Sequence, residues 1–184
     1  PPQSKSGSLL AVASDTGYVT LFDTETGALV SSFPAHSAPI RSLSFTSTLL
    51  ITGSDDKRIN VFDLRALTSS SSAAAGGTGG RRGQVASLGG HDGWVVSVAA
   101  RNDRLLASGS SDGTIKLFDL SAPSLALSTL RDHTADVWSL AWAPEATTGA
   151  AAVEGLGGAA AGLGGGRFVS AGEDGRVRWW TGGG

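Results

Sequence analysis

Residues 90–119, GHDGWVVSVAARNDRLLASGSSDGTIKLFD, contain the pattern that decides the fold. A histidine is followed by a short polar turn, by segments in which apolar and polar residues alternate, and by an aromatic residue next to an aspartate. Alternation with a period of two is typical of half-buried β-strands. Because no segment of the chain sustains an apolar period of about 3.6 residues, we expect few helices.

The same pattern recurs along the chain. The histidine-bearing heads are AHSAPIRSLSF (35–45), GHDGWVVSVAA (90–100) and DHTADVWSLAW (132–142), and the tails are SDTGYVTLFD (14–23), SDDKRINVFD (54–63), SSDGTIKLFD (110–119) and GEDGRVRWWT (172–181). One further short strand is expected before each head, at 28–33, 84–88 and 125–130. Each unit therefore supplies four strands, which is the content of one propeller blade.

These repeats resemble WD-repeat propellers, whose units begin with Gly-His and end with Trp-Asp. Gly90-His91 matches the Gly-His start. The pairs that stand where Trp-Asp is expected are Phe22-Asp23, Phe62-Asp63, Phe118-Asp119 and Trp180-Thr181. The resemblance implies an all-β propeller with about three and a half four-stranded blades. We expect a partial blade at 8–23 and blades at 28–63, 84–119 and 125–181.

Propellers of this family usually form a closed ring of seven blades, and closure removes exposed sheet edges. Half a ring would leave two open sheet faces. We therefore expect residues 1–184 to be part of a longer seven-bladed ring, and a self-associated pair of halves is the alternative.

Two insertions interrupt the repeats, at 66–83 and, inside the last unit, at 147–166, and their low-complexity stretches are 69–83 and 147–166. Both are rich in Gly, Ala and Ser and contain too little apolar surface to offset the entropy of ordering. We interpret them as flexible loop insertions. Neither contains Gly-Lys-Ser/Thr, so a phosphate-binding loop is not favoured.

The composition excludes several functional classes. The chain has 14 Lys and Arg against 16 Asp and Glu and no cysteine. It therefore lacks the basic surplus of a dedicated nucleic-acid binder, and it has no thiol for disulfides, zinc or catalysis. The chain contains no run of about 18 apolar residues, so we expect no membrane-spanning helix. We expect no cofactor, no metal, no direct nucleic-acid partner and no membrane partner.

All three histidines occupy the same repeat position, each with a hydroxyl and an aspartate at matching offsets. These residue types also form hydrolase triads, but a triad is recognised by its geometry, and an active site would be needed only once. In WD-repeat propellers such a set resembles a buried network that fixes each blade, so we predict a structural role and no enzyme. The predicted sets are His36/Thr52/Asp56, His91/Ser108/Asp112 and His133/Ser170/Asp174 with Trp180.

The family resemblance also implies a rigid disc that binds partners on one face, near the central channel. The corresponding positions are the third and fifth residues after each histidine and the residue before each turn aspartate. They are Pro39, Arg41, Asp55, Trp94, Val96, Ser111, Asp136, Trp138 and Glu173. Trp and Arg are frequent interface anchors, although packing of Trp94 and Trp138 between blades is the alternative. Trp142 is expected in the core, and Trp179 on the surface.

The heads and the closing GRVRWW (175–180) also resemble the C-terminal half of a WD-repeat subunit shared by the superkiller and RNA-polymerase-II-associated factor complexes. That resemblance implies a scaffold for RNA decay and transcription elongation, in the nucleus and the cytoplasm. Its partners would be a helical-repeat subunit and a helicase, or polymerase-associated factor subunits. The alternative is a WD-repeat adaptor of another assembly, such as a ubiquitin ligase or a ciliary complex.

Overall fold

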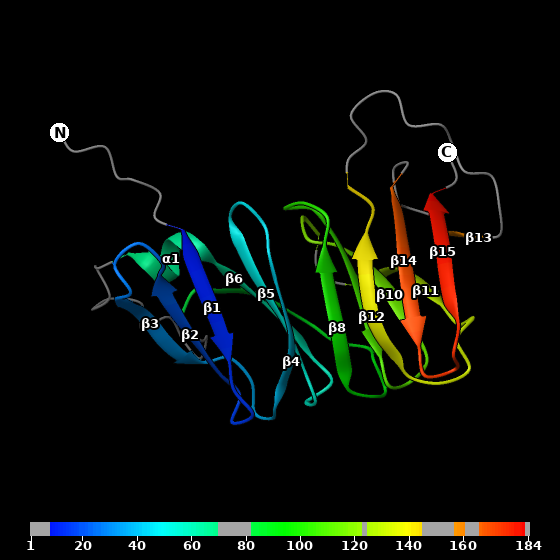
Figure 1. Cartoon of the computed structure of the whole chain (residues 1–184), viewed down its shortest axis with the longest axis horizontal. Coiled ribbons are helices and arrows are strands. Elements are labelled where there is room, and N and C mark those ends of the chain that lie inside the picture. The colour runs from blue at the N-terminus through cyan, green and yellow to red at the C-terminus, as the bar shows by residue number, and fades with distance from the viewer. Residues whose placement is uncertain (1–7, 70–81, 123–124, 145–156, 161–165, 183–184) are drawn as a thin grey trace.

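The computed structural model describes residues 8–69, 82–122, 125–144, 157–160 and 166–182. Within these ranges the chain forms four β-sheets and one short helix, and the sheets follow one another side by side (Figure 1). The expectation of few helices is met in the described part of the chain.

We number the sheets 1 to 4 in chain order and give their strands in spatial order. Sheet 1 contains β1 (Leu9–Ala13), β2 (Tyr18–Asp23) and β3 (Leu29–Pro34); sheet 2 contains β4 (Ile40–Phe45), β5 (Leu49–Ser54), β6 (Ile59–Asp63) and β7 (Gln84–Leu88). Sheet 3 contains β8 (Val95–Ala100), β9 (Leu105–Ser110), β10 (Ile115–Asp119) and β11 (Ala126–Leu130), in the order β11-β10-β9-β8. Sheet 4 has the order β12 (Val137–Trp142), β14 (Arg167–Gly172), β15 (Val177–Gly182) and β13 (Gly157–Ala160).

The sheets are offset by one strand from the units expected from the sequence. The strand expected at 28–33 was assigned to the blade 28–63, but it is β3 and pairs with β2 in sheet 1. In the same way the strands near 84–88 and 125–130 close sheets 2 and 3 as β7 and β11. A short link such as 24–28 allows an antiparallel hairpin, whereas the turn that contains the histidine crosses to the next sheet. Each sequence repeat therefore connects two neighbouring sheets.

The last sheet obtains its outer strand from an unexpected place. β13 lies inside the stretch 147–166, which was interpreted as a flexible insertion, and it pairs with β15 in parallel. It forms the outer edge of sheet 4, which is the position that β3, β7 and β11 hold in sheets 1, 2 and 3. Backbone pairing, which needs no apolar side chain, explains how a sequence of this composition can supply a strand.

The other insertion begins within a helix. α1 (Leu64–Thr68) follows β6 directly; Asp63 caps it by accepting a hydrogen bond from the Arg65 N–H, and its Leu67 is buried against sheets 1 and 2. The insertion expected at 66–83 therefore begins with the end of a helical turn at 66–68, which a cap and one buried leucine suffice to fix. Residues 70–81 and most of 147–166 lie outside the described residues.

Three apolar clusters hold the sheets together, one at each junction. Leu50 and Phe62 of sheet 2 pack against Val19, Leu21 and Phe33 of sheet 1. Leu106 and Phe118 of sheet 3 pack in the same way against sheet 2, and Phe168 and Trp180 of sheet 4 pack against sheet 3. Because side chains alternate along a strand, each of the two middle sheets buries both of its faces.

The innermost strands are also joined by hydrogen bonds. The Ser42 hydroxyl of β4 accepts from the Val98 N–H of β8 at 3.1 Å, and the Ser97 hydroxyl of β8 accepts from the Leu140 N–H of β12 at 3.1 Å. These contacts satisfy N–H groups on strand edges that no further strand covers. Within the described part of the chain, sheet 1 has no such inner strand.

Glycine allows the closest approach between sheets. A Cβ atom added to Gly109 would lie 2.7 Å from the Cγ1 atom of Val137. We predict that Gly109→Ala lowers the free energy of unfolding by about 1–3 kcal/mol, because the stiff valine on the neighbouring strand cannot move aside. Urea denaturation measures this change.

Gly89→Ala is the matched control, because nothing lies within 4 Å of the added Cβ atom and the backbone is not in the left-handed region. It should change the unfolding free energy by less than about 0.5 kcal/mol. Equal costs for the two variants would contradict the assigned packing.

Candidate functional site

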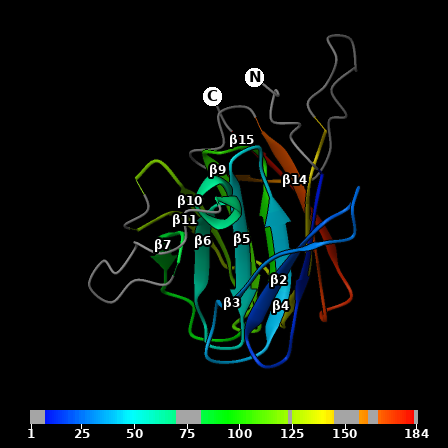
Figure 2. The ribbon, with the colours of Figure 1, turned by 90° about the vertical axis from the view of Figure 1, so that its left-hand side faces the viewer.

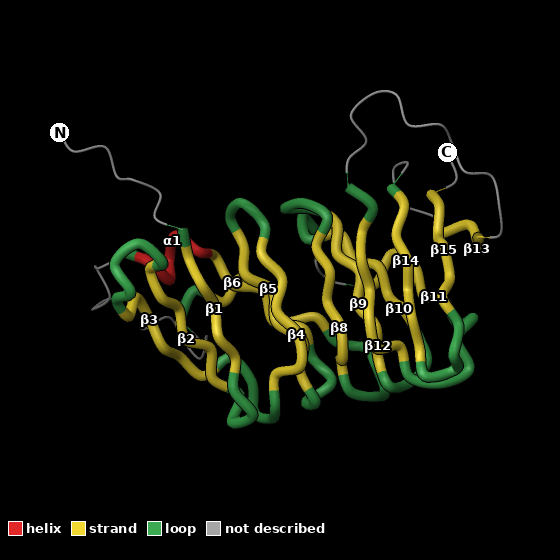
Figure 3. Tube along the Cα trace, viewed as in Figure 1, coloured by secondary structure: helices red, strands yellow, loops and turns green. Residues whose placement is uncertain are grey.

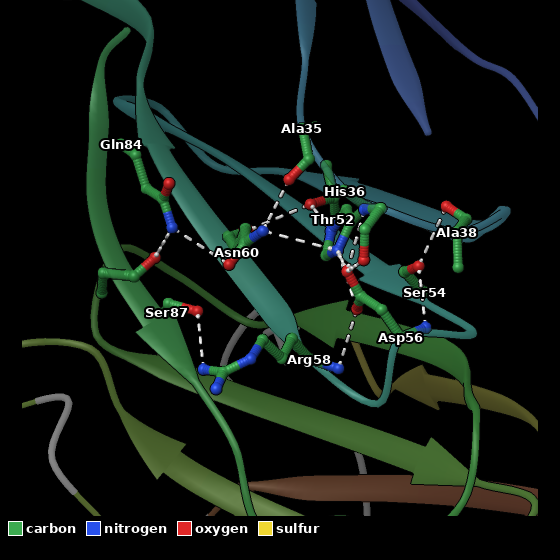
Figure 4. Close-up of polar contacts among 12 residues, drawn as sticks. Ala35, His36, Ala38, Thr52, Ser54, Asp56, Arg58, Asn60, Gln84 and Ser87 are labelled. Carbon is green, nitrogen blue, oxygen red and sulfur yellow. Dashed lines mark hydrogen bonds and ion pairs between the residues drawn. The ribbon is translucent and has the colours of Figure 1, made fainter. Parts of the chain in front are cut away.

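The first histidine network joins a crossing turn to the second and third strands of sheet 2. His36 Nδ1 lies 3.0 and 2.9 Å from the two carboxylate oxygens of Asp56, and His36 Nε2 lies 2.7 Å from Thr52 Oγ1 (Figure 4). The Asn60 side chain, which sequence reasoning missed, donates to the carbonyl of Ala35 at 2.7 Å. The structure thus brings all three predicted members together.

The second and third networks have the same geometry. His91 bridges Asp112 at 3.1 Å and Ser108 at 2.8 Å, and His133 bridges Asp174 at 2.9 Å and Ser170 at 2.7 Å. The Trp180 indole completes the last set by donating to Ser170 at 2.9 Å.

The direction of the hydrogen bonds in sheet 4 follows from which groups can only donate or only accept. The indole N–H can only donate and the ionised carboxylate can only accept. Trp180 therefore donates to Ser170, the Ser170 hydroxyl donates to His133 Nε2, and His133 Nδ1–H donates to Asp174. A neutral imidazole satisfies the whole chain, so each buried polar group has its partner.

Each network also has a member that differs between the sheets. Asn60 fills this place in sheet 2, and Arg178 fills it in sheet 4 by donating to Asp174 at 3.1 Å. In sheet 3 the equivalent residue is Lys116, which donates to Thr129, and the additional partner of Asp112 is Thr114, two residues after it, which donates at 2.6 Å. The available sequence signal was that Asn60 and Arg178 both stand four residues after the turn aspartate.

Burial of the hydroxyls opposes a catalytic function. Thr52 and Ser108 are 0% exposed and Ser170 is 1% exposed, each beneath its histidine. A nucleophile must be reached by its substrate, and these oxygens face the protein interior. Within the described part of the chain, no group of three or more His, Asp or Glu residues could hold a metal ion. No helix among the same residues is long and apolar enough to cross a membrane.

Six of the nine predicted partner-binding residues lie in turns at one end of the sheets, and the other three lie at the start of the strands that follow. We call this end the loop face; it contains the crossing turns 35–39, 89–94 and 131–136 and the turns 55–58, 111–114 and 173–176, at the lower edge of Figure 3. In each unit, the backbone N–H of the residue before the turn aspartate donates to the backbone carbonyl of the third residue after the histidine. The pairs are Asp55 to Pro39 at 3.0 Å, Ser111 to Trp94 at 3.0 Å and Glu173 to Asp136 at 2.8 Å.

The remaining three predicted residues share one backbone feature. Arg41, Val96 and Trp138 each stand at a break in strand register at the start of β4, β8 and β12. A bulge re-aims the side chain at that position and is often found beside a functional site. Sequence alternation alone could not have located these bulges.

Arg41 links two neighbouring sheets on the loop face. Its guanidinium makes two hydrogen bonds to Asp55, from Nε at 2.8 Å and from Nη2 at 2.6 Å. The same guanidinium lies 5.9 Å from the centre of the Trp94 ring. The two-pronged ion pair fixes the plane of the guanidinium, and the distance to the Trp94 ring is within the range of a cation–π contact.

The exposure of the tryptophans separates the surface residues from the core residues. Trp94 is 52% exposed and Trp138 is 58% exposed, so neither is buried between blades. Trp142 packs against the cluster between sheets 3 and 4, and its indole donates to the Ala99 carbonyl at 2.8 Å. Trp179 is exposed on the outer face of sheet 4, away from the loop face.

The repeats match the sequence family described as "WD domain, G-beta repeat" at residues 27–63, 82–119 and 125–181. The chain belongs to the WD-repeat family. Its relatives include WD repeat-containing protein slp1 of Schizosaccharomyces pombe, which is 30% identical over 77% of this chain and 26% of the relative. The ribosome biogenesis protein WDR12 homolog of Chlamydomonas reinhardtii is 30% identical over 88% of this chain and 32% of the relative.

A solved chain from "Crystal Structure of Mitotic Checkpoint Complex" superposes with a TM-score of 0.70 at 24% identity, over 94% of this chain and 44% of that chain. This likeness, together with the family match, confirms the prediction of an all-β WD-repeat propeller with about three and a half four-stranded blades. The chain spans about a quarter to a third of the two curated relatives.

Removal of one imidazole tests the structural role of the networks. We predict that His91→Ala lowers the free energy of unfolding by about 1–3 kcal/mol, because the fully buried Ser108 hydroxyl and the Asp112 carboxylate lose their hydrogen bonds to the imidazole. Asp92→Ala, at the exposed neighbouring position, should cost less than about 0.5 kcal/mol. Urea denaturation compares the two, and an unchanged midpoint for His91→Ala would refute the role.

The networks should also make stability depend on pH. Burial lowers the pKa of His91. Burial opposes ionisation of Asp174, but hydrogen bonds from the Arg176 N–H, His133 and the Thr134 N–H lower the pKa of Asp174 to about 2. Below about pH 6.5 the unfolded chain protonates His91 while the folded chain resists, so stability falls as the pH drops towards the lowered value. Asp174 extends this loss from about pH 4 down to about pH 2.

We therefore predict that the urea midpoint decreases between about pH 7.5 and pH 5.5. His91→Gln should flatten this dependence, because the titrating imidazole is absent, whereas Asp92→Asn should preserve it. A midpoint that stays constant across this interval in the unsubstituted protein would contradict the prediction.

Proposed function

We propose that this protein is a non-enzymatic scaffold that binds a protein partner on its loop face. The single observation that carries the proposal is the cluster of Arg41, Asp55 and Trp94, in which a guanidinium held by an ion pair in one sheet lies beside an exposed aromatic ring of the next sheet. Tryptophan and arginine are the residues most often found at the energetic centre of protein interfaces. An anchor that is already ordered loses little conformational entropy on binding.

The surroundings of the anchor favour a partner with both apolar and polar groups. Trp138 adds a second exposed ring, while Asp136 and Glu173 place carboxylates in the neighbouring turns. Asp136 and Trp138 lie at or near the start of the inner strand β12, and Glu173 lies in the turn between β14 and β15, beside the network aspartate Asp174. A rigid strand holds a binding residue more accurately than a free loop does.

Within this function, we propose a scaffold of a superkiller-type RNA-decay complex or of a polymerase-II-associated elongation complex. The support is the resemblance of the three heads and of residues 175–180 to that subunit. The proposed partners are a helical-repeat subunit and a helicase, or polymerase-associated factor subunits. The proposed locations are the nucleus and the cytoplasm.

The second candidate is a WD-repeat adaptor of another assembly, such as a ubiquitin ligase or a ciliary complex. The observation in its favour is that the names of the matched proteins refer elsewhere, to ribosome biogenesis and to a mitotic checkpoint complex. Both candidates use the same face and differ in the partner that they recruit.

Affinity purification of the full-length protein from its source cells tests both the face and the partner. We predict that Trp94→Ala weakens partner capture by about tenfold or more, because it removes the central anchor. Leu127→Ala is the matched control, since Leu127 is 50% exposed but lies on the outer strand β11. It should capture the partner as the unsubstituted protein does.

The proteins recovered separate the two candidates. A helicase together with a helical-repeat protein, or polymerase-associated factors, would support the superkiller-type or elongation scaffold. Subunits of a different assembly, lost on Trp94→Ala, would support the adaptor instead. Equal recovery with Trp94→Ala and with Leu127→Ala would overturn the assignment of the loop face.

A further inference from the structure

The turn between β5 and β6 contains a residue in an unusual backbone conformation. Lys57 has a φ angle of 68°, and it is the one residue other than glycine with a positive φ in the described part of the chain. The equivalent residues of sheets 1, 3 and 4 are Gly17, Gly113 and Gly175, with φ angles of 82°, 75° and 70°. This backbone region favours glycine, so a side chain that is kept there at a cost points to a use for that side chain.

Lys57 and the next residue, Arg58, form a pair of exposed cations. Within the described residues neither side chain makes an ion pair. The guanidinium of Arg58 has one neutral contact, to the Ser87 hydroxyl at 3.4 Å (Figure 4). In sheet 3 the same two positions hold Gly113 and Thr114, so a turn of this kind does not require the charges. The pair is therefore available to an anion.

Ser37 lies beside these cations, because it contacts the same carboxylate. Asp56 accepts from the Ser37 N–H at 3.2 Å through Oδ2 and from the Arg58 N–H at 3.1 Å through Oδ1. Ser37 is exposed in the crossing turn 35–39, which lies at the lower end of Figure 2, a view from the side of sheet 1. Its hydroxyl is 3.5 Å from Asp56 Oδ2, at the outer limit of a hydrogen bond. An exposed and weakly held hydroxyl in a surface turn is accessible to an enzyme.

The equivalent position in sheet 3 holds a permanent negative charge. Asp92 is exposed there, and its N–H donates to Asp112 at 2.8 Å, as the Ser37 N–H donates to Asp56. The network of His91 is complete beside it. A negative charge one residue after the histidine is therefore compatible with the folded sheet.

We propose that Ser37 is a phosphorylation site whose phosphate pairs with Lys57 and Arg58. In this step the Oγ atom of Ser37 bonds to the γ-phosphorus of a nucleoside triphosphate, while the bond between that phosphorus and its bridging oxygen breaks. The nucleoside diphosphate leaves with the bonding electrons, and the hydroxyl proton passes to the base of a protein kinase.

The two cations suit a phosphate in charge and in geometry. A phosphoserine carries a charge of roughly −1.5 to −2 at pH 7 and three acceptor oxygens. A guanidinium binds two such oxygens in parallel, and an ammonium adds a compact charge. Of the nearby carboxylates, Asp56 is held by His36 and Asp55 is paired with Arg41, while Asp15 lies in the turn of sheet 1. The phosphate therefore meets two cations against one further carboxylate.

The modification adds charge to the loop face and leaves the cluster of Arg41, Asp55 and Trp94 in place. It does not depend on the proposed function. The capture experiment with Trp94→Ala and the experiments on Ser37 can therefore fail separately.

Mass spectrometry of the full-length protein tests the site. One sample is isolated from the source cells with phosphatase inhibitors, and another is unphosphorylated protein incubated with ATP and an extract of these cells. We expect a phosphate on Ser37 and its loss in Ser37→Ala. Ser87→Ala is the matched control, because the Ser87 hydroxyl also contacts Arg58 and the residue is exposed, but it lies in β7; this variant should still be phosphorylated on Ser37. Absence of phosphate from Ser37 in both samples refutes the site.

A phosphorus NMR titration of the phosphorylated protein tests the pairing. Neighbouring cations favour the dianionic phosphate, so Lys57→Gly and Arg58→Gln should each raise the pH at the midpoint of its second ionisation by about 0.5. Lys57→Gly keeps the fold, because it restores the residue that the other three turns use. Arg65→Gln is the control, since Arg65 is exposed but lies in α1, and it should leave the midpoint unchanged. Equal midpoints for all of these proteins contradict the pairing.

Discussion

A buried imidazole held between a hydroxyl and a carboxylate is the interaction on which the arrangement of the sheets depends. Each histidine lies in the turn where the chain leaves one sheet and enters the next, and its partners lie on the second strand of the new sheet and in the turn after it. The network therefore sets the position of a crossing rather than of a single strand. Since the groups are buried, any displacement would leave a polar atom without a partner, so the crossing has one favourable geometry.

These crossings fix the positions of the residues on the loop face. The inner strands begin directly after them, and their bulges direct Arg41, Val96 and Trp138 at the same repeat position. Variation at those positions changes what the face presents without altering the network beneath it. The pairing of Arg41 with Trp94 shows that residues of neighbouring sheets combine into one surface, although each repeat contributes the same backbone.

Sequence reasoning located the strands and the histidine sets because spacing and alternation are local properties. The grouping of strands into sheets was less accessible: residues 28–33 are adjacent to the following head, yet the short link at 24–28 returns them to β2. β13 was missed because Gly157–Ala160 has no alternation to detect, and its pairing depends on backbone alone. The additional network members Asn60, Thr114 and Arg178 differ in chemistry, and Thr114 also stands at a different distance from its aspartate, so no single residue type marks them. Trp138 stands at a bulge, which a pattern with a period of two does not reveal, whereas Trp94 lies in the crossing turn before β8.

The offset between repeats and sheets bears on how such a chain can grow by gene duplication. A duplicated repeat would give its first strand to the sheet before it and three strands to a new sheet, whose outer strand the following repeat would supply. After the duplication, each strand at that point would therefore pair with a strand from the equivalent position of a repeat. Lengthening of the array at any internal point preserves each hydrogen-bonded edge, whereas a unit that formed one complete sheet would have to create a new contact on both sides by packing alone.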